Sequence, residues 1–233
     1  MTGTVSEKIE HETKFIVEQA RVASIIAWLN SRCRPDPLYP TGIVSSVYFD
    51  TPNWKFLSEK VNSDYIKTKI RVRWYSSIES GKPFDASFLE VKKKVGAGRS
   101  KLRVSADYSG QWLANSSLEN TDLLKVNQQL SAGILSISAP VFPVFLINYK
   151  RMRWIEPTTG SRICVDYDIN VPQVNSQRII KKQACNMNTA VFELKGSRRE
   201  LPPNLRQLVT FGCRKDSFSK YGNCYGILTR NEY

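Results

Sequence analysis

Charged and apolar residues alternate along five segments of the chain. The segments are Lys67–Trp74, Leu89–Lys94, Glu10–Lys14, Arg151–Arg153 and Glu193–Lys195, and their charged positions are mainly basic. Successive side chains of a β-strand point to opposite sides of the sheet, so each segment predicts a strand with one charged face. Five such faces favour a sheet that curls so that the charges line a common space.

The same patterning, together with the turn-forming residues, predicts eight strands. They are expected at Ile9–Val17, Ile43–Phe49, Asp64–Tyr75, Ser87–Lys94, Lys101–Tyr108, Phe142–Ile155, Ser161–Asp168 and Ala190–Gly196. Antiparallel strands of this number and length can close into a barrel. We therefore expect an α+β fold, an antiparallel eight-stranded β-barrel with flanking helices, formed as a single domain over residues 1–233.

Apolar residues with helical spacing predict the flanking helices. The segments are Glu18–Asn30, Gln111–Gly133, Leu201–Phe211 and a short helix that ends at Lys60. Arg34–Pro40 is rich in proline and is expected to be a loop. Asp216–Leu228 is rich in Ser, Tyr and Gly and is expected to be irregular.

The net charge changes the interpretation of these elements. Hydrophobic residues make up 41% and charged residues 24%, which is typical of a soluble globular protein, but the formal net charge is +13. Such an excess favours polyanionic partners, namely nucleic acid, an anionic membrane or phosphate compounds. An even distribution of the same charge would indicate only solubility, so the placement of the charges decides between these interpretations.

The cysteines and the apolar segments indicate the compartment. The five cysteines form no C-x-x-C pair and have no zinc-ligand spacing. Their odd number, without a secretory segment, predicts reduced thiols in a cytoplasmic protein. No apolar run approaches the ~20 residues that cross a bilayer, so we expect no membrane segment in this chain.

Inward-facing rows would place many cations around one space. The basic set is Lys14, Lys69, Arg71, Arg73, Lys92, Lys101, Arg103, Arg151, Arg153, Arg162 and Lys195, and the acidic set is Glu10, Glu12, Glu90, Asp166 and Glu193. Such a space must hold water or bind anions, because unpaired buried ions cost several kcal/mol each, and the number of cations favours a polyanionic guest. Carboxylates would repel phosphate unless a divalent metal bridges the two, so the mixture favours metal-assisted phosphoryl chemistry. Charged rows on a solvated outer face remain the alternative.

Short motifs then indicate a family. In chain order they are EHETKF, YFDT, KIRVRWY, LEVKKK, SKLR, YKR, RICVDYD, FELK and FSKYG, from Glu10 to Gly222. Together they resemble the VTC domain, which is named from the vacuolar transporter chaperone complex. That domain belongs to the triphosphate tunnel metalloenzymes, which also include CYTH-type adenylate cyclases, thiamine triphosphatases and tripolyphosphatases.

The resemblance implies an activity and a set of site residues. VTC domains transfer the γ-phosphate of ATP to a growing inorganic polyphosphate chain in a basic tunnel, with Mn²⁺ or Mg²⁺ as cofactor. The implied catalytic phosphate ligands are Lys14, Arg71, Arg73, Lys92, Lys101, Arg151, Arg162 and Lys220. Further phosphate-binding residues are Lys69, Lys195, Ser219 and Tyr149. Glu193 would be the principal metal ligand, joined by Glu12, Glu10 and Glu90.

Two other functions remain open at this point. Glu10–Lys14 also spells E-x-E-x-K, the signature of the CYTH branch, so hydrolysis of tripolyphosphate or a nucleoside triphosphate is the nearest alternative. A non-catalytic module that binds polyphosphate or nucleic acid is the alternative from another class. We expect ATP and polyphosphate or pyrophosphate as partners rather than nucleic acid. We expect neither the SPX domain nor the transmembrane segments of the eukaryotic complex in this chain, and a membrane partner is kept as an alternative.

Overall fold

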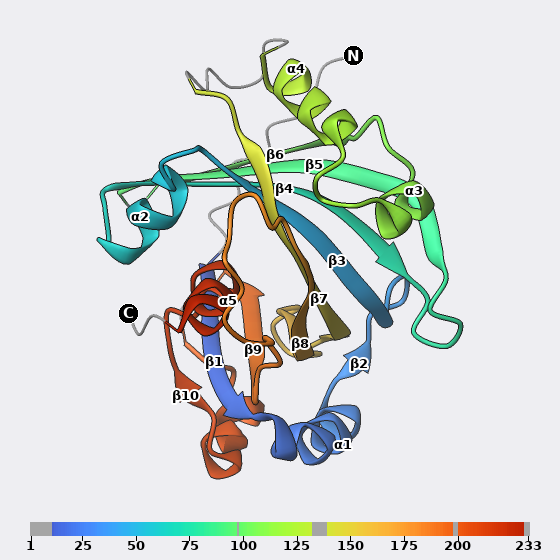
Figure 1. The fold of residues 1–233 in the computed structure, drawn as a ribbon. Coiled ribbons are helices and arrows are strands. Elements are labelled where there is room, and N and C mark those ends of the chain that lie inside the picture. The colour runs from blue at the N-terminus through green and yellow to red at the C-terminus, as the bar shows by residue number, and fades with distance from the viewer. Residues whose placement is uncertain (1–10, 97, 132–138, 198–199, 231–233) are drawn as a thin grey trace. The chain divides into compact units, whose positions relative to one another are not determined.

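A computed structural model describes residues 11–96, 98–131, 139–197 and 200–230 as a sheet of ten strands with flanking helices (Figure 1). The strands are β1 (His11–Glu18), β2 (Arg34–Pro35), β3 (Thr41–Asp50), β4 (Ile66–Ser76), β5 (Pro83–Val95), β6 (Gly98–Ser105), β7 (Phe142–Ile155), β8 (Arg162–Val174), β9 (Thr189–Gly196) and β10 (Arg214–Lys215). The antiparallel α+β class predicted from the sequence is confirmed.

The helices are short. They are the α-helices α1 (Val22–Arg32), α2 (Lys55–Val61), α3 (Gly110–Asn115), α4 (Val126–Ser131) and α5 (Lys220–Thr229), and the 3₁₀ helices η1 (Gln19–Arg21), η2 (Thr121–Lys125) and η3 (Pro203–Phe211). In the part of the chain that the structure describes, none of them combines the length and the apolar character of a membrane-spanning helix.

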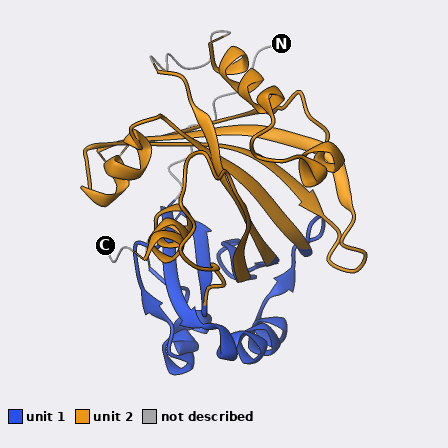
Figure 2. Ribbon diagram, in the orientation of Figure 1, with its two compact units in different colours: residues 1–41, 151–167, 188–218 blue, residues 42–150, 168–187, 219–233 orange. Residues whose placement is uncertain are grey.

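The chain divides into two compact units (Figure 2). Unit 1 contains residues 1–41, 151–167 and 188–218, and unit 2 contains residues 42–150, 168–187 and 219–233. In unit 1 the strand order is β10-β1-β9-β8-β7, with β2 paired to β7. In unit 2 the order is β8-β7-β3-β4-β5-β6, so β7 and β8 contribute residues to both units. The single domain expected from the sequence stays a prediction.

All eight predicted strands are present, but the eight-stranded barrel is not confirmed. The sheet has ten strands, because two-residue strands form at Arg34–Pro35 and Arg214–Lys215, which the residue pattern does not distinguish from loops. Within the described residues the strand order runs from β10 to β6 and does not close.

Each unit has a core on the apolar side of its alternating strands. In unit 2, Val72, Trp74 and Leu89 are buried and belong to one cluster with Leu113 of α3 and Val126 of α4. In unit 1, apolar residues of β1 and β9 pack with residues of α1 and η3. Because side chains alternate along a strand, burial of one face directs the intervening charged side chains to the other face.

The helices differ from the prediction in two places. The segment predicted as one helix over Gln111–Gly133 consists of α3, η2 and α4, and its last two residues lie outside the described residues. The prediction of an irregular Asp216–Leu228 is wrong, since α5 begins at Lys220. Its glycines disfavour a helix in isolation, but tertiary packing compensates, because the Tyr221 ring stacks on those of Tyr48 and Phe145.

The start of α3 gives a testable consequence of this packing. A Cβ atom on Gly110 would lie 2.1 Å from the carbonyl oxygen of Phe84 and 3.2 Å from Cβ of Trp74. We expect Gly110→Ala to lower the free energy of unfolding by roughly 2 kcal/mol, as overpacking typically does. The matched control is Gly42→Ala, whose added Cβ would meet only Ser76 O at 3.5 Å. Urea denaturation of both variants checks this, and equal stabilities would contradict it.

Candidate functional site

The charged faces of β4, β5 and β6 join into one surface in unit 2. The strand register places nine basic residues and one acidic residue on it, among the residues that the structure describes. We call this surface the basic face; it consists of Lys67, Lys69, Arg71, Arg73, Glu90, Lys92, Lys94, Arg99, Lys101 and Arg103. The intervening residues, such as Ile70 and Val91, belong to the core.

The basic face is ordered in ranks that run across the three strands. Cross-strand partners form the Glu90 rank (Arg71, Glu90, Arg103), the Lys92 rank (Lys69, Lys92, Lys101) and the Lys94 rank (Lys67, Lys94, Arg99). Like charges that are directly opposite each other destabilise a sheet. Two consecutive ranks of three cations are therefore costly unless an anion compensates them.

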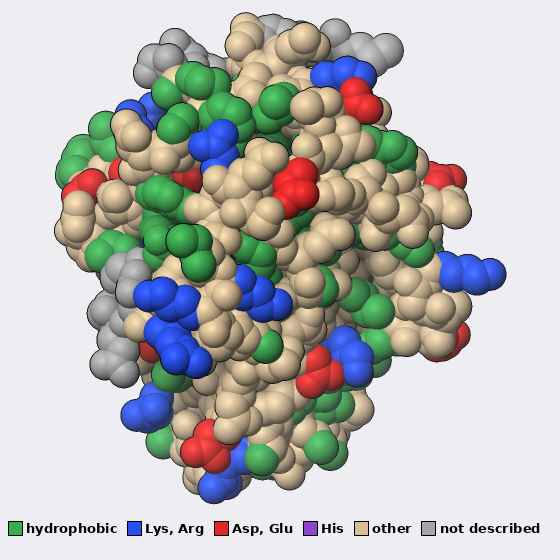
Figure 3. Space-filling model, in the orientation of Figure 1, with side chains coloured by type: hydrophobic (Ala, Val, Ile, Leu, Met, Phe, Trp, Pro, Cys, Tyr) green, Lys and Arg blue, Asp and Glu red, His purple; other side chains and the backbone are tan. Residues whose placement is uncertain are grey.

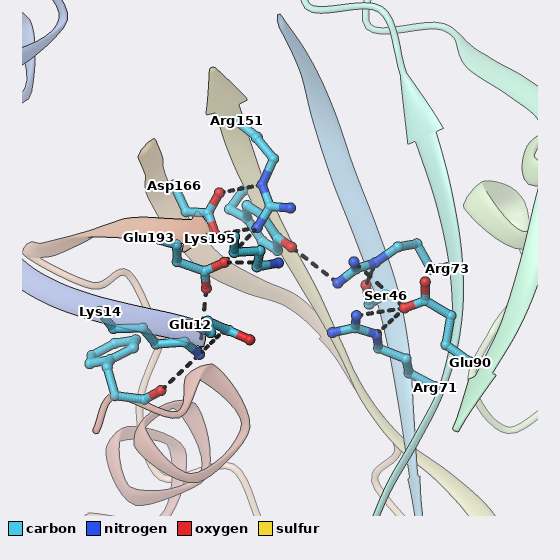
Figure 4. A network of polar contacts seen from close by, with 12 residues as sticks. Glu12, Lys14, Ser46, Arg71, Arg73, Glu90, Arg151, Asp166, Glu193 and Lys195 are labelled. Carbon is cyan, nitrogen blue, oxygen red and sulfur yellow. Dashed lines mark hydrogen bonds and ion pairs between the residues drawn. The ribbon is translucent and has the colours of Figure 1, made fainter. Parts of the chain in front are cut away.

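Glu90 is the one carboxylate of the basic face, and it is 1% exposed (Figure 4). Its Oε2 accepts hydrogen bonds from Arg71 Nε at 2.8 Å and Arg71 Nη2 at 2.5 Å, and Arg73 Nη1 lies 3.6 Å away. Its Oε1 contacts Lys101 Nζ at 3.0 Å and Arg103 Nε at 3.8 Å. Four cations thus share a single negative charge.

The charge state of Glu90 follows from this environment. Burial by itself raises the pKa of a carboxyl group, but the positive charges of Arg71, Arg73 and Lys101 outweigh that effect. The pKa of Glu90 is accordingly held well below its ordinary value. Glu90 therefore remains ionised and acts as a permanent counter-ion.

Hydroxyl groups fix the two arginines further. Arg71 Nη1 donates to the Tyr48 hydroxyl at 3.1 Å. Arg73 Nε donates to Ser46 Oγ at 2.9 Å, and its Nη2 donates to the Tyr149 hydroxyl at 3.1 Å. Arg73 is 5% exposed. These bonds hold both guanidinium groups in defined orientations without neutralising them.

The first residues of α5 add a second source of cations and hydroxyls in unit 2. Ser219 caps the helix by accepting from the backbone N–H of Gly222, and its Oγ also accepts from Lys69 Nζ at 3.0 Å. Lys220 Nζ lies 4.7 Å from the centre of the Tyr149 ring. The unexpected helix α5 therefore positions both residues that the FSKYG motif supplies.

A buried carboxylate holds α5 in place. Asp50, which is fully buried, accepts a hydrogen bond from the Tyr221 hydroxyl at 2.6 Å. It also accepts from the backbone N–H groups of Phe56 and Leu57 at 2.9 Å each, in the first turn of α2. Asp50 is not among the site residues predicted from the sequence, although it belongs to the YFDT motif and lies five residues before the start of α2.

Unit 1 contains a different cluster, in which acids and bases nearly balance (Figure 4). We call it the carboxylate cluster; it consists of Glu12, Lys14, Arg151, Asp166, Glu193 and Lys195. Arg151 forms a bidentate pair with the buried Asp166, with N–O distances of 2.5 and 2.6 Å. Its Nη2 lies 3.7 Å from Glu193 Oε2.

Lys14 contacts two of the four glutamates predicted as metal ligands, Glu12 and Glu193. Its Nζ lies 3.3 Å from Glu12 Oε1 and 3.5 Å from Glu193 Oε1, and it donates to Phe218 O at 3.4 Å. Lys195 Nζ lies 3.8 Å from the other oxygen of Glu193. The described residues contain no group of three or more Asp, Glu, His or Cys side chains placed to hold a metal. A pair of carboxylates nevertheless suits Mg²⁺, which is commonly bound by one or two carboxylates completed by waters and substrate phosphates.

The remaining predicted residues occupy three kinds of position. Arg162 lies opposite Lys195 in the register of β8 and β9. Arg153 donates to Tyr39 O at 2.9 Å, at an exposed position in unit 1. Glu10 lies outside the described residues.

On the face of the molecule seen in Figure 3, basic side chains are interspersed with acidic and hydrophobic ones.

The fold and the two clusters define an antiparallel α+β protein that concentrates cations on one sheet face. The sequence profile of the VTC domain matches residues 9–229, and the chain therefore belongs to the VTC domain family. Comparison with curated protein sequences finds no significant match.

Solved structures resemble the fold at low sequence identity. A suspected adenylate cyclase of Bacillus halodurans is 14% identical, with a TM-score of 0.52 over 91% of this chain and 94% of that one. A protein of Pyrococcus horikoshii is 14% identical, with a TM-score of 0.48 over 91% and 97% of the two chains. A suspected adenylate cyclase of Vibrio parahaemolyticus is 9% identical, with a TM-score of 0.47 over 94% and 98%. The first of these shows a shared fold.

Removal of the counter-ion tests the Glu90 network. In Glu90→Gln, four neighbouring cations lose their shared negative charge, and we expect the free energy of unfolding to fall by roughly 3 kcal/mol, as when a buried ion pair is broken. Thermal unfolding measures the change, with Glu79→Gln, at an exposed position, as the control. Tripolyphosphate should raise the melting temperature of Glu90→Gln, because an anion that binds the folded state stabilises it. Equal melting temperatures for the two variants would refute this account.

The pH dependence of the same variant gives a second test. Because the pKa of folded Glu90 lies below its ordinary value of 4.5, its stabilising contribution is complete above pH 4.5 and is lost as the pH falls toward the folded-state pKa. The stability difference between wild type and Glu90→Gln should therefore be constant near neutral pH and narrow in acid. Urea denaturation across a pH series checks this, and a gap that widens in acid would be the opposite result.

Proposed function

We propose that this protein is a metal-dependent polyphosphate polymerase that transfers the γ-phosphate of ATP to a growing inorganic polyphosphate chain. The observation that carries the proposal is the excess of nine basic residues over one acidic residue on the basic face. Membership of the VTC domain family supports the choice of phosphate chains as the guest and of a tunnel as the working architecture.

The basic face suits a chain of phosphates because its cations are arranged in successive ranks. Each phosphate of a bound triphosphate would meet its own set of cations, and arginine adds bidentate contacts with phosphate oxygens. Arg71 and Arg73 are already oriented by Glu90, Tyr48 and Tyr149. Preoriented charges stabilise a transition state more than mobile ones do, because little reorganisation is needed during the reaction.

The carboxylate cluster suits the cofactor. Glu12 and Glu193 would hold Mn²⁺ or Mg²⁺ together with phosphate oxygens, while Arg151 and Asp166 fix the surroundings of Glu193. The bound metal would neutralise negative charge on the transferred phosphoryl group. Lys14, which contacts both glutamates, would be displaced or would itself bind phosphate.

The reaction needs no general base. The terminal phosphate oxygen of the polyphosphate chain is already an anion, and it attacks the γ-phosphorus of ATP in line with the bond to the bridging oxygen. That bond breaks, a new P–O–P link forms, and ADP leaves with the electron pair. The cations of the basic face would neutralise the charge that develops on the bridging oxygen.

The second candidate is hydrolysis of tripolyphosphate or a nucleoside triphosphate. The contact between Glu12 and Lys14 favours it, because both belong to the E-x-E-x-K motif. In that case water replaces the phosphate chain as nucleophile.

A non-catalytic binder of polyphosphate or nucleic acid is the third candidate. We propose a cytoplasmic location, with ATP and polyphosphate or pyrophosphate as partners.

Product analysis tests the activity directly. Purified protein incubated with ATP and Mn²⁺ should yield a ladder of acid-labile polymer on a gel, whereas orthophosphate alone would indicate a hydrolase. Glu193→Gln should lower product formation on the order of a hundredfold, as expected for loss of transition-state charge stabilisation. Glu18→Gln, an exposed position on β1, is the matched control.

Binding separates the enzyme from the simple binder. Glu193→Gln should retain its affinity for polyphosphate, measured by titration calorimetry, while its product formation is lost. ATP consumption equal to that of the wild type in this variant would contradict the assigned role of Glu193. Binding without any turnover by the wild type would favour the non-catalytic alternative.

A further inference from the structure

Two aromatic residues extend the basic face at one end. Phe88 lies opposite Arg73 and Ser105 in the register and precedes Glu90 on the same face of β5. Tyr75 lies two positions after Arg73 on β4. The rings of Tyr75 and Phe88 meet edge to face, with their centroids 6.4 Å apart. Both residues are partly exposed, unlike the buried aromatics of the core such as Trp74. The alternation thus places an aromatic pair beside the cations rather than in the core.

A guanidinium group connects the aromatic pair to the Glu90 rank. Arg103 Cζ lies 3.8 Å from the centre of the Phe88 ring and 5.9 Å from the centre of the Tyr75 ring. Its Nε lies 3.8 Å from Glu90 Oε1. Nucleic-acid bases stack on aromatic rings and on arginine planes, and such stacking tolerates different bases because every base has a π-face.

The sequence of features along the strands matches the parts of a nucleoside triphosphate. Along β5, Phe88 is followed by the Glu90 rank, then by the Lys92 rank and the Lys94 rank. Lys92 is four positions after Phe88, which corresponds to about 13 Å along a strand. An extended nucleoside triphosphate covers a comparable distance from its base to its terminal phosphate.

We infer that Tyr75, Phe88 and Arg103 form a nucleoside-binding subsite for the donor nucleotide. The base stacks against Phe88 and Arg103, and the triphosphate extends along the basic face, with its terminal phosphate at the Lys92 rank. The assignment rests on the proposed use of a nucleoside triphosphate as donor. Because the contacts are stacking contacts, the subsite accepts a purine without selecting between adenine and guanine.

The test compares two ligands that differ only in the nucleoside. Titration calorimetry without divalent metal, which prevents turnover, measures the affinities for ATP and for tripolyphosphate. Phe88→Ala should weaken ATP binding about tenfold, the loss expected for one base–aromatic stack, and should leave tripolyphosphate binding within about twofold. Wild-type protein should bind GTP within a few-fold of ATP, as stacking without base-edge recognition implies.

Matched variants keep the result interpretable. Phe88→Leu preserves an apolar side chain on the strand and should show the same selective loss, while Phe88→Tyr should restore ATP binding. Phe84→Ala, at an exposed phenylalanine of the same strand, should behave as wild type. A melting temperature for each variant establishes that it is folded.

Three results would overturn the subsite. Equal loss of ATP and tripolyphosphate binding in Phe88→Leu would show a structural role for the ring. Unchanged ATP binding in both Phe88→Ala and Phe88→Leu would place the base elsewhere, while the polymerase proposal would stand. Wild-type protein that binds tripolyphosphate but not ATP would overturn the subsite and the nucleotide donor together.

Discussion

The charge on Glu90 is the interaction on which the rest of unit 2 depends. Strand alternation and register bring nine cations to one sheet face, and their mutual repulsion opposes folding of the same three strands that present them. A single buried carboxylate compensates four of them, and its depressed pKa reflects how strongly they hold it ionised. The remaining excess of positive charge is the property that would suit the surface to a polyanion, as the proposed function requires. The same positive charges that would favour anion binding lower the stability of the folded sheet, and a bound anion would offset this loss of stability.

The two clusters differ in their charge balance, and this difference suggests a division of labour. In unit 1 the bases Lys14, Arg151 and Lys195 face the acids Glu12, Asp166 and Glu193, so that cluster is nearly neutral. A nearly neutral set in which two carboxylates contact the same lysine would suit a divalent cation. The basic face is strongly positive and suits phosphate. The proposed reaction needs both properties, since metal and cations together neutralise a triphosphate more completely than either alone.

The period of two allowed much of the fold to be predicted. It identified all eight long strands, and in five segments it also identified the charged face, because burial of one face leaves the other to polar residues. It also identified Arg71, Arg73 and Glu90 as residues of one face. It did not reveal that cations concentrate on β4, β5 and β6 while β1 and β9 carry a balanced cluster. Register between strands is a tertiary property, and a list of alternating segments does not contain it.

Other differences have similarly physical causes. Helix α5 contains two glycines and was predicted as irregular, but the contacts of Tyr221 with Asp50, Tyr48 and Phe145 outweigh its low helix propensity. The partners of the arginines, Ser46 and Tyr149, lie on strands distant in the sequence and become neighbours only in the sheet. By strand alternation Arg153 is expected on the same face of β7 as Arg151. It donates instead to the backbone carbonyl of Tyr39, because the segment after β2 lies beside it.

A crystal structure of the protein with bound tripolyphosphate would show whether the basic face is the phosphate site. We expect successive phosphates to lie on the basic face, within hydrogen-bond distance of Arg71, Lys92 and Lys101. Tripolyphosphate that is ordered elsewhere on the protein, with these three side chains contacting only protein groups and solvent, would contradict it.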